Sequence, residues 1–140
     1  MGVFGTGSFD NDDALDWART LEESRGLKVL KRTLREVLDA GDGVLEAQIA
    51  LQGMAAAEVV AGLNDSPADD LPEEIETWIE EQRGRSETDL SPLALEALER
   101  IQVKCELIDQ LKKCGEYDVW IAVVKDLEQR LNGDDVSDPK

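Results

Sequence analysis

The 140-residue sequence contains no histidine and has few aromatic and basic residues. Without histidine, it lacks the commonest general base and the commonest metal ligand of proteins. Aromatic residues make up 4% of the chain, too few for an extended base-stacking platform. Fifteen lysines and arginines stand against 32 aspartates and glutamates, which gives a formal net charge of −17. This balance argues against nucleic-acid binding through phosphate neutralisation and against adhesion to an anionic membrane.

The two cysteines, Cys105 and Cys114, fall in a stretch that the sequence predicts to be helical. Nine helical residues correspond to about 13 Å along the axis, which is too far for a disulfide. Two unpaired thiols are typical of a reducing cytoplasm. Residues 1–6 have neither the basic nor the apolar region of a secretory signal. We therefore expect a cytoplasmic protein.

Apolar residues recur at helical spacing along most of the chain, and no alternating apolar–polar run of useful length predicts a strand. Six helices are expected. The first follows Asn11-Asp12-Asp13, the second begins at Leu27, and the third occupies residues 44–63. The fourth begins near Pro72, the fifth runs from Ser91 to about Lys113, and the sixth runs from about Asp118 to Leu131. The sequence therefore predicts an all-α fold, a single compact bundle of about six helices in one domain over residues 1–133. A Gly-rich lead-in over residues 1–11 precedes the bundle, and an acidic tail over residues 134–140 is expected to be flexible.

Residues 44–63 differ from the other predicted helices because apolar side chains occur on every side. Fourteen of these 20 residues are Ala, Val, Ile, Leu or Met, but no uninterrupted apolar run exceeds four residues. A membrane-spanning helix needs about 20 consecutive, predominantly apolar residues. We therefore expect this segment to be the buried central helix of the bundle.

Glu58 lies in the middle of this apolar segment, so it must be paired, hydrogen-bonded or protonated if the helix is buried. One interpretation is a structural acceptor for backbone N–H groups of the lead-in or for a tryptophan indole. Trp17, Trp78 and Trp120 each lie on the apolar side of a predicted helix, which favours core packing. The other interpretation of Glu58 is a general acid or base, or the anchor of a ligand. No nucleophile motif or paired acid accompanies it, so the sequence lacks a complete catalytic set.

Charge is distributed unevenly along the chain. Residues 25–41 carry five basic and two acidic side chains, whereas residues 64–91 carry ten acidic and two basic ones. One interpretation is that the basic helix packs beside the acidic segment and relieves self-repulsion. The other is a polarised surface whose acidic side docks a basic partner and accelerates association. The acidic docking face would consist of Asp69, Asp70, Glu73, Glu74, Glu76, Glu80 and Glu81.

The cluster at residues 10–13, Asp-Asn-Asp-Asp, offers oxygen ligands for a divalent cation. An EF-hand loop beginning at Asp10 requires glycine at its sixth position and glutamate at its twelfth, where this sequence has Leu15 and Leu21. The EF-hand interpretation therefore fails. Helix capping and a divalent site of another kind both remain open.

The first 17 residues, MGVFGTGSFDNDDALDW, resemble the N-terminal signature MGxWGxGxFxNDxAxDW of bacterial domain-of-unknown-function family 4259. Phe4 stands where that family usually has tryptophan. The alanine-rich stretch Ala55–Gly62 and the ending around Trp120 and Leu127 are also similar to the family. The resemblance implies a small bacterial α-helical domain, and it supplies no established activity and no site residues.

The sequence thus favours a non-enzymatic protein-binding module, and an inhibitor or immunity-like role against a basic protein is one specific form of it. A second interpretation is a protein that binds a small molecule or a divalent metal ion through Asp10, Asn11, Asp12, Trp17 and Glu58. A third is a homo-oligomeric structural protein that uses a spare apolar stripe of the 91–113 helix. We expect no cofactor, no nucleic acid and no membrane as a partner, and a monomer or homodimer as the state in solution.

Overall fold

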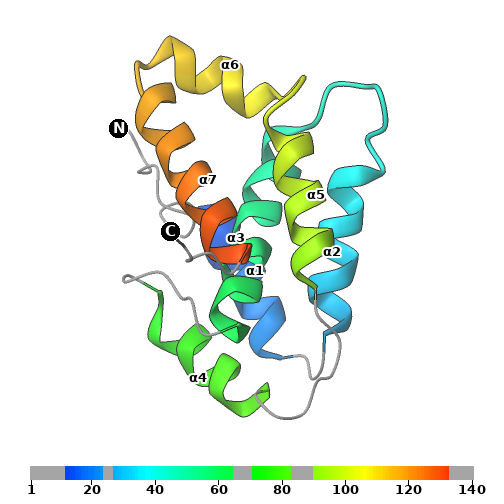
Figure 1. Ribbon diagram of the computed structural model, residues 1–140, viewed down its shortest axis with the longest axis vertical. Coiled ribbons are helices and arrows are strands. Elements are labelled where there is room, and N and C mark those ends of the chain that lie inside the picture. Colours follow the sequence, from blue (N-terminus) through cyan, green and yellow to red (C-terminus); the bar gives the residue numbers. More distant parts are fainter. Residues whose placement is uncertain (1–11, 24–26, 65–70, 83–89, 133–140) are drawn as a thin grey trace, which may run out of the picture.

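The computed structural model describes residues 12–23, 27–64, 71–82 and 90–132, and within these ranges it contains seven helices and no strand (Figure 1). The helices are α1 (Asp12–Glu22), α2 (Lys28–Leu38), α3 (Ala47–Leu63), α4 (Glu73–Gln82), α5 (Ser91–Ile101), α6 (Glu106–Lys113) and α7 (Tyr117–Leu131). The predicted all-α class is confirmed. The predicted lead-in and acidic tail lie outside the described residues, and the domain boundaries stay a prediction.

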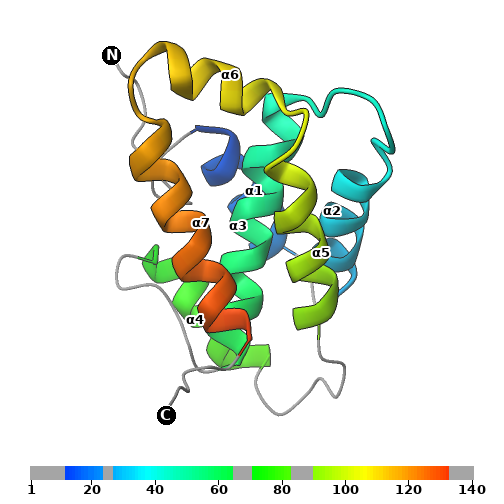
Figure 2. The same cartoon turned by 45° about the horizontal axis from the view of Figure 1, so that its top comes forward.

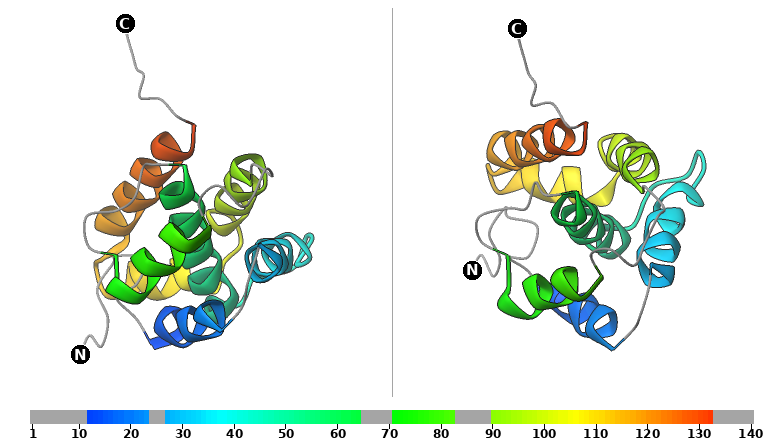
Figure 3. Two further views of the ribbon diagram at one scale, coloured as in Figure 1. Left: turned by 90° about the horizontal axis from the view of Figure 1, so that it is seen from below. Right: turned by 60° about the horizontal axis from the view of Figure 1, so that its bottom comes forward.

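Helix α3 is the centre of the bundle, and each of the other six helices packs against it (Figure 3). Its buried residues include both small and large side chains on all sides, from Ala50 to Gly62. A helix that is apolar all round is stable only when neighbours cover its whole circumference. The predicted central helix is therefore confirmed, although it begins at Ala47 rather than at Val44.

The helix predicted over 91–113 is divided into α5 and α6, which is why the structure has one helix more than expected. Figure 2 shows α6 turning away from the direction of α5. Lys104 adopts a φ of 50°, in the left-handed region that a helix cannot continue through. Beside it, Leu45 donates its N–H to the Lys104 carbonyl at 2.8 Å and accepts the Glu106 N–H at 2.9 Å. The chain before α3 thus supplies the hydrogen bonds that the helix gives up at this corner.

Arg100 holds the same corner to the loop between α2 and α3. Its guanidinium donates hydrogen bonds to the carbonyls of Gly41, Gly43, Val103 and Lys104. A charged donor that satisfies several carbonyls compensates well for the helical hydrogen bonds lost at the break. The prediction of one continuous helix is therefore wrong, and Val103 is 57% exposed at the corner.

The packing of α2 on α3 depends on the absence of a side chain at Gly53. A Cβ at this position would lie 2.6 Å from Val37 Cγ2 and 3.3 Å from Ile101 Cδ1. Gly53 therefore lets α2, α3 and α5 approach closely at one point of the core. None of the seven helices, all within the described ranges, has the length and apolar character that crossing a bilayer requires.

Candidate functional site

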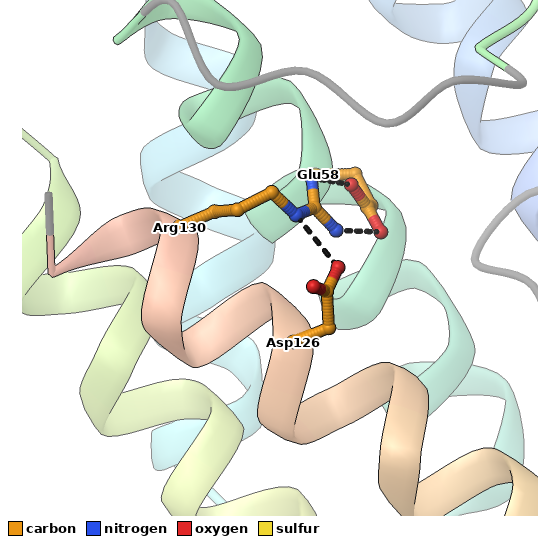
Figure 4. Close-up of polar contacts among 3 residues, drawn as sticks. All are labelled: Glu58, Asp126 and Arg130. Atoms are coloured by element: carbon orange, nitrogen blue, oxygen red, sulfur yellow. Dashed lines mark hydrogen bonds and ion pairs between the residues drawn. The ribbon is translucent and has the colours of Figure 1, made fainter. Parts of the chain in front are cut away.

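Glu58 is buried on α3, with 3% of its side chain exposed, and it faces the last turns of α7. Arg130 reaches it from α7 and donates two hydrogen bonds, from Nη1 to Oε1 at 2.9 Å and from Nη2 to Oε2 at 3.1 Å (Figure 4). The Arg130 Nε donates in turn to Asp126 Oδ2 at 2.9 Å. The guanidinium thus binds both oxygens of one buried carboxylate and one oxygen of an exposed carboxylate.

The electrostatics of this cluster keep Arg130 charged. Burial alone would lower the pKa of the guanidinium, but its hydrogen bonds and charge interactions with Glu58 and then Asp126 outweigh burial and raise that pKa. Parallel two-point binding is the strongest geometry for an arginine and a carboxylate. The arrangement is that of an ion pair that joins α3 to α7.

Arg130 is a donor to Glu58 that the sequence analysis did not consider, and the predicted donors of the lead-in lie outside the described residues. The structural and the ligand-anchor interpretations of Glu58 both stay predictions. Trp17 donates its indole N–H to Thr33 Oγ1 at 2.7 Å, and Trp120 donates its indole N–H to Met54 Sδ at 3.1 Å. Arg130 could have been recognised from its position between the buried Leu127 and Leu131, which places a cation beside the inward side of α7.

The three tryptophans are core residues, as predicted, with 5%, 3% and 2% of Trp17, Trp78 and Trp120 exposed. Of the predicted N-terminal ligands, Asp10 and Asn11 lie outside the described residues. Asp12 is the exposed first residue of α1. Within the described ranges, the structure brings together no group of three or more acidic or cysteine side chains placed to hold a metal ion. The site proposed around Glu58 and the N-terminal cluster stays a prediction.

Helix α4 presents a continuous acidic surface. Ile75, Trp78 and Ile79 are buried and anchor the helix on α1 and α3. Its outward residues, here called the α4 acidic face, are Glu73, Glu74, Glu76, Glu80 and Glu81, all exposed. The other two predicted members, Asp69 and Asp70, lie outside the described residues. Apart from Glu80, the side chains of this face make no ion pair or hydrogen bond with any residue that the structure describes.

Three residues of the α4 acidic face, Glu73, Glu74 and Glu81, line a hollow of about 360 Å³ between α1 and α4. Its lining residues are Glu22, Glu73, Glu74, Thr77, Trp78 and Glu81. Four carboxylates at one hollow create a region of negative potential that attracts cations. Glu73 and Glu74 also lie in the first turn of α4, where the helix dipole stabilises negative charge. These carboxylates therefore gain stability from their own helix and remain available to a partner.

The basic helix α2 does not compensate this charge. It packs against α1, α3 and α5 and has no contact with α4, so the expected internal complementarity is wrong for α4 (Figure 3). Its outward cations, here called the α2 basic face, are Lys28, Lys31, Arg32 and Arg35. Among the described residues, none of these side chains has an ion-pair or hydrogen-bond partner. Like charges at helical spacing of three or four residues cost the helix about 0.2–0.5 kcal/mol per pair.

A second hollow, of about 570 Å³, lies where α2 ends and α3 begins. Its charged lining residues are Glu36, Asp39 and Glu46, and the remainder are Ala40, Val44, Leu45, Gln48, Ile49 and Gln52. The lining residues include no serine, threonine, cysteine or cation, so this hollow offers no nucleophile with an activating partner.

Comparison with known proteins places the chain in a family without assigning an activity. The model of the domain of unknown function DUF4259 matches residues 2–122, which is most of the chain. No curated protein and no solved structure matches it. The matched span includes Glu58 and both charged faces, whereas Asp126 and Arg130 lie beyond it. The chain therefore belongs to the DUF4259 family, a domain of unknown function.

Proposed function

We propose that this protein is a protein-binding module whose α4 acidic face docks a basic helix of a partner. The observation that carries the proposal is the hollow between α1 and α4, which four carboxylates line together with Thr77 and an edge of the largely buried Trp78. A lysine or arginine side chain placed there would bring its charged group to these carboxylates. The proposal is a binding role, and it assigns no reaction.

The rest of the molecule supports this role. Because Ile75, Trp78 and Ile79 are buried, α4 is held in place before a partner arrives, and little ordering is needed on binding. A net charge of −17 draws basic partners toward the protein and repels acidic ones. An inhibitor or immunity-like role is a specific form of the proposal, in which the acidic face occupies a basic surface that its partner needs for its own activity.

The test uses a synthetic alanine-based helical peptide with lysines at positions i, i+3, i+4 and i+7, and a matched peptide with glutamines there. Three exposed ion pairs at about 0.5 kcal/mol each correspond to roughly tenfold in affinity. We therefore expect the triple variant Glu73→Lys, Glu74→Lys, Glu81→Lys to bind the lysine peptide about tenfold or more weakly than the unmodified protein. Fluorescence anisotropy at low and high salt measures the difference.

The matched control is the triple variant Glu99→Lys, Asp109→Lys, Asp118→Lys. It makes the same change in net charge, and both triples contain two acids from a first helical turn and one from a last turn. None of α5, α6 and α7 contacts α4. The proposal is refuted if the two triple variants lose the same affinity, because the attraction would then reflect net charge and not the α4 acidic face.

A further inference from the structure

The α2 basic face gathers four cations on one helix of an acidic protein, and none of the four has an ion-pair partner among the described residues. Its four cations lie on the outer side of α2, while Leu30, Leu34 and Val37 on the opposite side are buried. In a protein with a net charge of −17, cations without an ion-pair partner among the described residues are unexpected, because acidic residues outnumber basic ones two to one. The structure keeps them apart from the largest acidic surface, since α2 and α4 do not touch.

The two faces are opposite in charge and similar in length. From Lys28 to Arg35 the cations span about 10.5 Å of helix, and from Glu73 to Glu81 the carboxylates span about 12 Å, at 1.5 Å per residue. At about 100° per residue, the cations cover about 100° of the circumference of α2, and the carboxylates cover about 160° of that of α4. Both helices lie on different sides of α3 and do not touch each other, so no described helix brings the two faces together within one molecule (Figures 1 and 3).

We infer that the α2 basic face of one copy docks on the α4 acidic face of a second copy. This inference rests on the proposed function, because it names the partner of the same α4 face. Lys28, Arg32 and Arg35 provide the basic helix that the hollow between α1 and α4 is suited to receive. The contact joins two different surfaces, so each docked copy leaves one α2 face and one α4 face exposed. Such a heterologous contact continues into a chain or closes into a ring.

The net charge of the protein sets the conditions under which this contact forms. At about 0.1 M salt the Debye length is about 10 Å, so charges in contact attract while the more distant acids of two copies are largely screened. At about 1 M salt the Debye length is about 3 Å, so the attraction between exposed charges on the two copies is strongly weakened. The association should therefore be present near 0.1 M salt and absent near 1 M salt.

The experiment is sedimentation velocity of the full chain over concentrations up to about 1 mM at both salt concentrations. The unmodified protein should exceed its monomer mass of 15.4 kDa as concentration rises near 0.1 M salt, and return to that mass near 1 M salt. Two variants each neutralise three residues of one face: Lys28→Gln, Arg32→Gln, Arg35→Gln on α2, and Glu73→Gln, Glu74→Gln, Glu81→Gln on α4. Each variant alone should associate about tenfold or more weakly, so it should need at least about ten times the protein concentration to reach the same mean mass as the unmodified protein.

A mixture of the two variants provides the decisive result. Each variant keeps the face that the other lacks, so only one contact is possible and the mixture should stop at a 1:1 complex of twice the monomer mass. The control variant Lys112→Gln, Lys113→Gln, Lys125→Gln removes three cations from α6 and α7, neither of which contacts α2, and should associate like the unmodified protein. Circular dichroism of every variant establishes that the helices are intact.

Three results would overturn the inference: a monomer at every concentration, an association that the α2 and α4 variants leave unchanged, or an equal loss in the control. The lysine-peptide assay separates this failure from failure of the proposed function. If the peptide binds the α4 acidic face while the protein stays monomeric, the partner is not a second copy and only this inference is refuted. If the peptide does not bind, the proposed function is refuted as well.

Discussion

Replacing Arg130 by leucine should destabilise the protein by leaving the Glu58 carboxylate buried without its cation. Removing one partner of a fully buried ion pair costs about 3–5 kcal/mol. Only 3% of the Glu58 side chain is exposed, whereas 19% of Arg130 is exposed, so water can enter the space that the guanidinium leaves. We therefore expect a loss near the lower end of that range, about 3 kcal/mol of the free energy of unfolding. This is a large part of the 5–15 kcal/mol that a domain typically has, so the variant should fold but unfold early.

The double variant Glu58→Leu, Arg130→Leu separates the pair from the packing around it. With both charges removed, no uncompensated carboxylate remains, and a well-packed apolar pair is often neutral relative to a buried ion pair. The double variant should therefore be more stable than Arg130→Leu alone, with a coupling energy of about 2 kcal/mol in the double-mutant cycle. Asp126→Asn is the control: the Asp126 side chain is 64% exposed, so its loss should cost less than about 0.5 kcal/mol.

Urea denaturation followed by circular dichroism and by tryptophan fluorescence measures five proteins: the unmodified protein, Glu58→Leu, Arg130→Leu, the double variant and Asp126→Asn. Trp120 lies on α7 with its indole against Met54 of α3, so its emission reports on the same contact between helices that the ion pair joins. If Arg130→Leu costs less than about 1 kcal/mol and the coupling energy is near zero, the ion pair does not hold α7 on α3. Glu58 would then be a residue whose burial has another purpose, and the ligand-anchor interpretation would gain support.

Two further predictions concern the core and the thiols. Gly53→Ala places a Cβ 2.6 Å from Val37 Cγ2, so the cost of overpacking, about 1–3 kcal/mol, should exceed the gain of about 1 kcal/mol in helix propensity. Urea unfolding should show a net loss of stability, and the loss should be smaller when Val37→Ala is added. An unchanged or raised stability would contradict this close packing at Gly53. Burial raises the pKa of the Cys105 thiol, against the opposing effect of the backbone N–H groups behind it, whereas Cys114 is exposed. Iodoacetamide at about pH 8 should therefore alkylate Cys114 first, and Cys105 only when the protein unfolds locally or globally. Mass spectrometry of timed samples measures the two alkylation rates, and equal rates for the two thiols without denaturant would refute this prediction. The pKa of Cys105 is higher in the folded protein than in the unfolded chain. The contribution of this thiol to the free energy of unfolding is therefore fully present below about pH 8.5 and decreases as the pH rises above that value.

Local periodicity in the sequence was sufficient to predict the helices and their buried sides. Leu30, Leu34 and Val37 recur at helical spacing along α2, and all three are fully buried. The apolar residues on every side of 44–63 predicted the one helix that all others surround. These features could be predicted because the side of a helix that a residue occupies depends only on its position within a few turns of chain.

The end of α5 could not be predicted in this way. The apolar seam continues through Ile101, Cys105 and Ile108, as it would in one long helix, and all three residues are buried. The helix ends because Leu45 and Arg100 provide hydrogen bonds to the corner. Leu45 reaches this corner only through the tertiary structure, and nothing in the periodicity of 91–113 indicates its presence.

The sequence by itself determined the helical class, the central place of α3, and the presence of one acidic and one basic helix, because each follows from residues close together in the chain. The tertiary structure decided that Glu58 binds Arg130, 72 residues away, and that α2 and α4 lie apart. The physical reason is that burial of a charge requires a partner but does not specify which one. The partner is the cation that the packing of α7 on α3 places beside Glu58, and that packing depends on the whole bundle.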